Sequence, residues 1–102
     1  MIGFKVVRVN FPSTTGRPQE VNGFANFSSI VISAQTALNG FDASFKNGDH
    51  HLGEIQIDCA GDPTWSGDRV DFSVSFLLRD WSGDIDDPYA GWVDVLVIAD
   101  LK

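Results

Sequence analysis

The sequence predicts an all-β fold, in which residues 1–102 form a single-domain antiparallel β-sandwich of about six strands. Three observations predict this fold. Apolar side chains recur at every second position in several segments, which is the period of a strand with one buried face. Asp far outnumbers Glu, and ten Gly and four Pro accompany it, which favours turns over helix interiors. No segment shows a helical period, and 102 residues suffice for only one core.

The elements expected in the first part of the chain are short. Alternation predicts a strand over Phe4–Val9. The next segment, Phe11–Asn22, contains two prolines and a glycine and is expected to be a loop. A short strand is expected over Gly23–Phe27, although Phe24 and Phe27 are in imperfect register.

Alternation in the middle of the sequence predicts three strands. The first is Ile30–Leu38, whose apolar face would hold Ile30, Ile32, Ala34, Thr36 and Leu38. Asn39-Gly40 is a turn signal, and Phe41–Phe45 alternates as a short extension after it. The third strand is Leu52–Cys59, in which the alternation places Cys59 on the apolar side as a small core residue.

The last part of the chain carries the clearest strands. Residues 60–68, which include Trp65, are expected to form a loop, and Val70–Leu78 alternates five apolar residues with mostly polar ones. The final strand, Gly91–Leu101, is apolar on both faces, because Trp92, Leu96 and Ile98 lie opposite the valines. Such a strand is expected at the centre of its sheet or at a subunit interface.

Charge and composition exclude several classes of partner. Seven basic and 14 acidic residues give a net charge of −7, which argues against nucleic acid and anionic membranes as ligands. No apolar run is long enough for membrane insertion, and residues 1–11 lack the pattern of a signal peptide, which leaves the localisation open. Cys59 is the only cysteine, so an intrachain disulfide is impossible.

Catalytic motifs are absent from the sequence, so the chain is not expected to be an enzyme. No nucleophile elbow, phosphate loop or metal-binding helix motif occurs. His50 and His51 are adjacent, and neighbours on a strand point to opposite faces, which places them poorly for binding one ion. Asp49 and Glu54 could join His50 in a loop, but a polar turn is the simpler interpretation.

An acidic segment between two aromatic residues is the most distinctive feature. Asp84, Asp86 and Asp87 lie between Trp81 and Tyr89. The three carboxylates could bind Ca²⁺, which prefers six to eight oxygen ligands. They could instead line a sugar site, in which a pyranose stacks on an aromatic face and donates hydrogen bonds to Asp. A solvated hairpin loop is the third interpretation, and the residues alone leave all three open.

A series of residues after position 28 follows the order found in a known family. Asp42 stands at a turn, Phe72 in the alternating strand, Trp81 and Asp84 just after that strand, Tyr89 in the next loop and Ala99 in the closing strand. In this order the chain resembles the H-type lectin domain. The resemblance implies a six-stranded antiparallel sandwich that forms trimers or hexamers. It also implies binding of galactose or N-acetylgalactosamine at subunit interfaces, through Trp81, Asp84, Tyr89 and Asp42.

Two functions are therefore expected. The first is a non-enzymatic, carbohydrate-binding homo-oligomer whose partners are glycans and further copies, with no cofactor or with Ca²⁺ at Asp84, Asp86 and Asp87. The alternative is a structural or interaction module, such as a trimeric fibre or assembly subunit, that binds no sugar. The family's sugar-contacting arginine has no counterpart here, since the corresponding strand offers Glu54, Gln56 and Asp58, and this favours the alternative.

Overall fold

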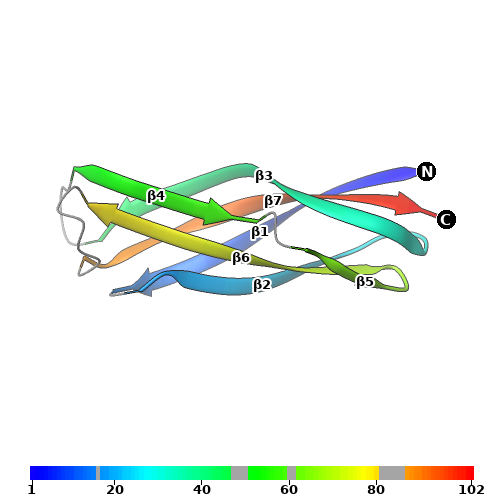
Figure 1. Ribbon diagram of the computed structural model, residues 1–102, viewed down its shortest axis with the longest axis horizontal. Helices are drawn as coiled ribbons and strands as arrows, with labels where there is room; N and C mark the ends of the chain where they lie inside the picture. Colours follow the sequence, from blue (N-terminus) through cyan, green and yellow to red (C-terminus); the bar gives the residue numbers. More distant parts are fainter. Residues whose placement is uncertain (16, 47–50, 60–61, 81–86) are drawn as a thin grey trace.

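The computed structural model describes residues 1–15, 17–46, 51–59, 62–80 and 87–102. Its strands form two antiparallel sheets that pack face to face, which confirms the predicted all-β sandwich (Figure 1). Within the described residues there are seven strands rather than six: β1 (Ile2–Thr14), β2 (Gln19–Asn26), β3 (Val31–Phe45), β4 (Leu52–Asp58), β5 (Thr64–Ser66), β6 (Arg69–Asp80) and β7 (Tyr89–Leu101). None of these residues belongs to a helix long and apolar enough to cross a bilayer.

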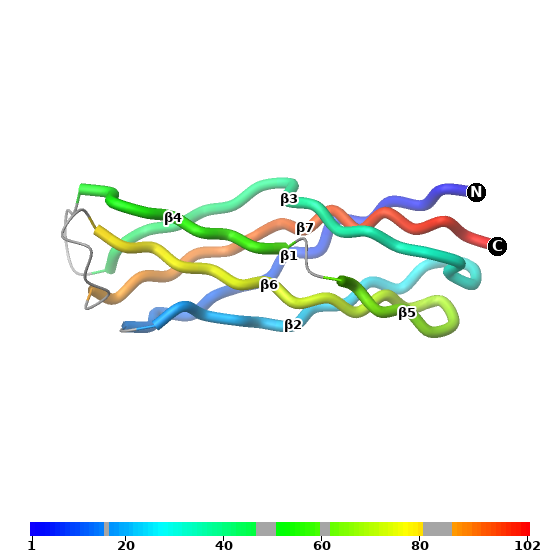
Figure 2. Tube along the Cα trace, viewed as in Figure 1, coloured from blue at the N-terminus to red at the C-terminus, as the bar shows by residue number. Residues whose placement is uncertain are grey.

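The strands run along the length of an elongated body of 49 × 18 × 17 Å (Figure 2). One sheet has the strand order β1-β7-β3. The other has the order β2-β6-β4, and β5 also pairs with β6. The last strand, β7, thus lies between β1 and β3, which confirms the central position that its two apolar faces predict.

The core lies between the two sheets and is built mainly from alternate residues of β6 and β7. Its most enclosed members are Val70, Val74, Phe76, Tyr89, Val93, Val95, Val97 and Ala99. These positions confirm the predicted inner faces of both strands. Cys59 is buried at the end of β4, as the alternation predicts.

The loop expected over Phe11–Asn22 is wrong, because β1 continues to Thr14 and β2 begins at Gln19. Pro12 is compatible with this strand, since β1 is an edge strand with one side free of a hydrogen-bonded partner. Phe11 is buried, and its ring stacks on Phe76 with the ring centroids 4.9 Å apart. This contact extends the core along β1 as far as the residue before Pro12.

The face predicted for Ile30–Leu38 is also wrong at its start. The register of β3 against β7 shifts between Val31 and Ser33, and such a bulge exchanges the two faces of a strand. Val31 is therefore buried, whereas Ile30 and Ile32 are each 54% exposed. A second register shift lies between Leu38 and Gly40, so Asn39-Gly40 is a bulge within one long strand and not a turn between two.

Candidate functional site

The outer surface of the three-stranded sheet carries an apolar patch. On this side Phe4 lies directly opposite Ile98, Val6 lies opposite Leu96, and Ala37 of β3 lies on the other side of Leu96. Phe4 is 65% exposed and Val6 53% exposed, since no further layer covers them. We call these five residues, Phe4, Val6, Ala37, Leu96 and Ile98, the outer apolar face.

The outer apolar face exists because β1 and β7 are apolar on both sides. In β1, Val7 and Val9 point towards the core while Phe4 and Val6 point outwards. A strand with one solvated face normally alternates apolar with polar residues. Monomeric proteins rarely expose a large contiguous apolar patch, so this surface is a candidate for an interface.

Paired charges flank the outer apolar face along the sheet. At one end, the Arg8 guanidinium donates two hydrogen bonds to the Asp94 carboxylate, at 2.9 and 3.1 Å. The same guanidinium stacks over Trp92, with Cζ 3.7 Å from the ring centroid. The bonds from Arg8 lower the pKa of the Asp94 carboxyl. At the other end, the terminal amine of Met1 lies 3.5 Å from the Asp100 carboxylate.

Asp42 lies near the outer apolar face, as the pairing of β3 with β7 shows. It is exposed on β3 and stands directly opposite Trp92 of β7. Cross-strand partners share a face, so both residues lie on the outer side of the three-stranded sheet. Asp42 is thus accessible, as a ligand-binding carboxylate must be.

Tyr89, in contrast, lies inside the sandwich with no exposed surface. Its hydroxyl donates to the backbone carbonyl oxygens of Arg17 and Phe76, at 2.7 and 3.1 Å. Its ring packs near that of Phe76, with a centroid separation of 5.6 Å. In this arrangement the ring offers no face on which a sugar could stack. Burial raises the pKa of the phenol, as expected for a group held away from water.

The remaining predicted site residues do not form a site that the structure describes. Trp81, Asp84 and Asp86 lie outside the described residues. Asp87, which follows Asp86 in the sequence, is described and is half-buried. In the part of the chain that is described, no cluster of three His, Cys, Asp or Glu side chains could hold a metal ion. The calcium site therefore stays a prediction from the sequence. Asp49 and His50 also lie outside the described residues, and His51 is exposed.

Trp65 is a functional candidate that the sequence reasoning missed. The predicted loop over residues 60–68 contains the short strand β5, which pairs with the start of β6. The two residues between these strands are Gly67, with φ of 60°, and Asp68. Gly-Asp between two strands is a hairpin signal, so the sequence did contain the information needed to find β5.

Comparison of the chain with protein-family models, with curated proteins and with solved structures finds no match in any of the three. The resemblance to the H-type lectin domain accordingly stays a prediction from the sequence. The function is argued below from the geometry of the outer apolar face and of the groove beside Trp65.

Proposed function

We propose that the chain is a non-enzymatic assembly module that associates with further copies of itself through the outer apolar face. The observation that carries this proposal is the exposure of Phe4 and Val6 beside the half-buried Leu96 and Ile98. Covering apolar surface is the main favourable term in protein association, at about 25 cal/mol per Å². The proposal corresponds to the alternative function that the sequence predicts.

A second copy is the partner that fits this surface by charge. The outer apolar face lies on one side of a sandwich that is 49 Å long and 18 Å wide. The charges flanking the apolar face are already paired, as Arg8 with Asp94 and the Met1 amine with Asp100. A second copy therefore brings few unpaired charges into the contact.

Symmetry limits which assemblies this face can build. A surface that packs on the same surface of a second copy is related to it by a two-fold axis. A dimer contains such an axis, and so does a hexamer of two stacked trimers. A plain trimer does not, because its contacts join two different surfaces. The mass of the assembly thus distinguishes the face-to-face contact from the trimer that the resemblance implies.

The test compares the mass of the wild-type chain in solution with that of two single variants. Phe4→Glu places a charge in the outer apolar face, while Leu52→Glu makes a similar change at a residue of β4 that is 59% exposed and lies on the other sheet. We expect sedimentation velocity to give an even-numbered oligomer for the wild type and for Leu52→Glu, and half of that mass for Phe4→Glu, which is a monomer from a dimer or a trimer from a hexamer. A wild-type monomer at high concentration, or an unchanged mass in Phe4→Glu, contradicts the proposal.

Carbohydrate binding is the second candidate function, and one specific observation favours it. Trp65 is 42% exposed and lines a groove at the edge of the sandwich together with Asp62. An exposed aromatic face next to a carboxylate is suited to a sugar. The direct test is binding of the wild-type chain to an array of glycans, with and without Ca²⁺. Galactose and N-acetylgalactosamine are the ligands expected from the resemblance, and an array without any bound glycan removes this candidate.

A further inference from the structure

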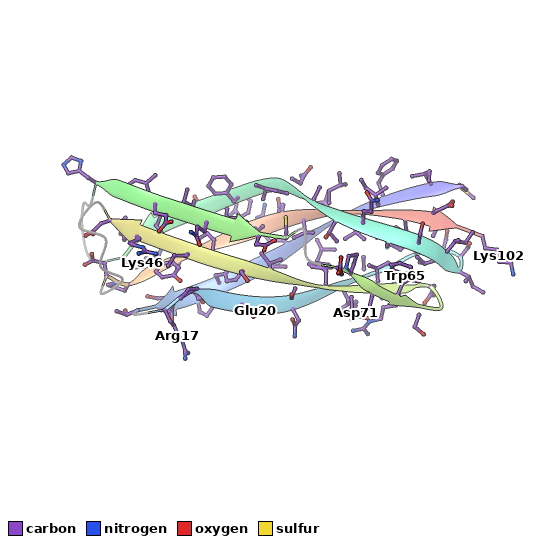
Figure 3. The ribbon with its side chains drawn as sticks, viewed as in Figure 1. Arg17, Glu20, Lys46, Trp65, Asp71 and Lys102 are labelled. Carbon is purple, nitrogen blue, oxygen red and sulfur yellow. The ribbon has the colours of Figure 1, made fainter. Side chains whose placement is uncertain are left out.

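The indole of Trp65 stands at the open edge between the two sheets (Figure 3). Trp65 on β5 is the register partner of Val70 on β6, which is completely buried. Cross-strand partners share a face, so the indole lies on the side of its sheet that faces the other sheet. The neighbouring strand β3 does not cover it fully, which leaves 42% of the residue exposed.

A groove of about 480 Å³ lies beside this indole, within the 300–1,000 Å³ typical of small-molecule sites. Its lining comes from β3 and from the segment that leads into β5: Ala34, Gln35, Thr36, Asp62, Pro63 and Trp65. The Thr36 hydroxyl donates a hydrogen bond to the carbonyl oxygen of Cys59, at the end of β4. This bond ties β3 to the end of β4 across the two sheets, so Thr36 is held in place before a ligand arrives.

The groove presents a flat apolar surface next to two polar groups. Within the described part of the chain, no hydrogen bond or ion pair engages the Asp62 carboxylate or the indole N–H of Trp65. The side chain of Gln35 lies on the outer side of the three-stranded sheet, because Gln35 is the register partner of Ile98. Asp62 is exposed, so water is bound to its carboxylate until a ligand replaces that water. A ligand that fits must therefore offer both an apolar face and several hydrogen-bonding groups.

The charge of the groove narrows the class of ligand further. No Lys, Arg or His is among the described residues that line it, and the net charge of the chain is −7. Phosphates, nucleotides and acidic peptides are therefore disfavoured. A wholly apolar ligand is disfavoured too, because it would strip water from the Asp62 carboxylate without replacing the hydrogen bonds of that water.

We propose that this groove binds a neutral hexopyranose. One C–H face of the sugar ring packs on Trp65, and its hydroxyls donate to the Asp62 carboxylate. The proposal deepens the carbohydrate-binding candidate above and rests on it, but it does not depend on self-association. A single open site of this kind binds weakly, and several linked copies would raise the apparent affinity by avidity.

The test measures binding of the methyl glycosides of galactose, N-acetylgalactosamine, glucose and mannose by ligand-observed NMR and by calorimetry. Trp65→Ala removes the stacking surface, and we expect about tenfold weaker binding. Phe24→Ala is the matched control, because Phe24 is 47% exposed and lies under Arg69, outside the groove. Asp62→Ala keeps the indole but removes the acceptor, and Asp62→Asn should restore part of the lost affinity because its amide oxygen still accepts.

Each outcome either supports or overturns the proposal. Binding of one glycoside that is weakened in Trp65→Ala and Asp62→Ala, and unchanged in Phe24→Ala, supports it. Binding that all three variants retain overturns the groove as the site while leaving carbohydrate binding intact. No binding of any glycoside overturns both the groove and the second candidate function. Binding of inorganic phosphate as tight as that of the glycosides overturns the assignment to neutral sugars.

Discussion

Tyr89→Phe removes one hydroxyl from the middle of the sandwich and leaves the ring in place. In the wild type this hydroxyl is shared between the carbonyl oxygens of Arg17, in the β1–β2 connection, and of Phe76, in β6. The residue has no exposed surface, so water has no direct access to the position that the hydroxyl vacates. The variant therefore separates the polar role of Tyr89 from its packing role.

The structure allows the cost of this change to be estimated. The ring contact with Phe76 is kept, because phenylalanine has the same ring, and the loss lies in the hydrogen bonds alone. Leaving a buried acceptor unsatisfied costs about 1–3 kcal/mol. For a domain of this length each kcal/mol lowers Tm by roughly 4–8 °C. We therefore expect the unfolding free energy to fall by about 1–2 kcal/mol and Tm to fall by roughly 5–15 °C.

Urea unfolding and a thermal melt, both followed by circular dichroism, measure these losses. Ser29→Ala is the matched control, since its hydroxyl donates to the carbonyl oxygen of Lys102 at 2.7 Å on the exposed surface. Water replaces that bond, so the control should change stability by less than about 0.5 kcal/mol. If Tyr89→Phe is as stable as Ser29→Ala, the buried hydroxyl does not hold the β1–β2 connection to β6, and the reasoning fails.

Two further predictions concern stability. Burial raises the pKa of the Cys59 thiol above its usual value, so the native state keeps a proton that the unfolded chain releases. The free energy of unfolding should therefore fall as the pH rises through about 9, and by less in Cys59→Ala, as urea titrations at a series of pH values would measure. A Cβ added at Gly91 would overlap the carbonyl oxygen of Asp42, whereas one at Gly40 meets nothing within 4 Å. Gly91→Ala should thus cost about 3 kcal/mol or more and Gly40→Ala about 0.5 kcal/mol or less, and equal melting temperatures would contradict this.

Sequence periodicity predicts the fold best where one face of a strand is clearly apolar. In β6, the run from Val70 to Leu78 alternates almost without interruption, and its inner residues are those expected. β3 is predicted poorly because its two bulges exchange inner and outer positions. No local pattern near Ile32 marks the first bulge, and Asn39-Gly40 at the second gives the same signal as a turn between two strands. The inner face of β1 is ambiguous in the sequence for another reason. Phe4 and Val6 are apolar on one side of the strand, and Val7 and Val9 are apolar on the other.

The candidate surfaces are predictable to different degrees. Trp92, Leu96 and Ile98 already mark the outer side of β7 in the sequence, because a solvated face would be polar there. The groove beside Trp65 could not be found in this way, since β3 and β5 come together only when the two sheets pack. Tyr89 is expected in a sugar site from the sequence but is buried in the structure. Its neighbours in the sequence, Asp87 and a valine-rich strand, do not indicate whether its ring faces the core or the solvent.

The place of β7 in its sheet has a consequence for how the chain is synthesised. Residues 89–101 leave the ribosome after the other six strands, yet β1 and β3 each depend on them for their backbone pairing. The four-stranded sheet can close earlier, because its members β2, β4, β5 and β6 all precede residue 81. Until β7 has been synthesised, β1 and β3 have no partner strand in their sheet. At this stage aggregation competes with folding, and a chaperone would have most effect.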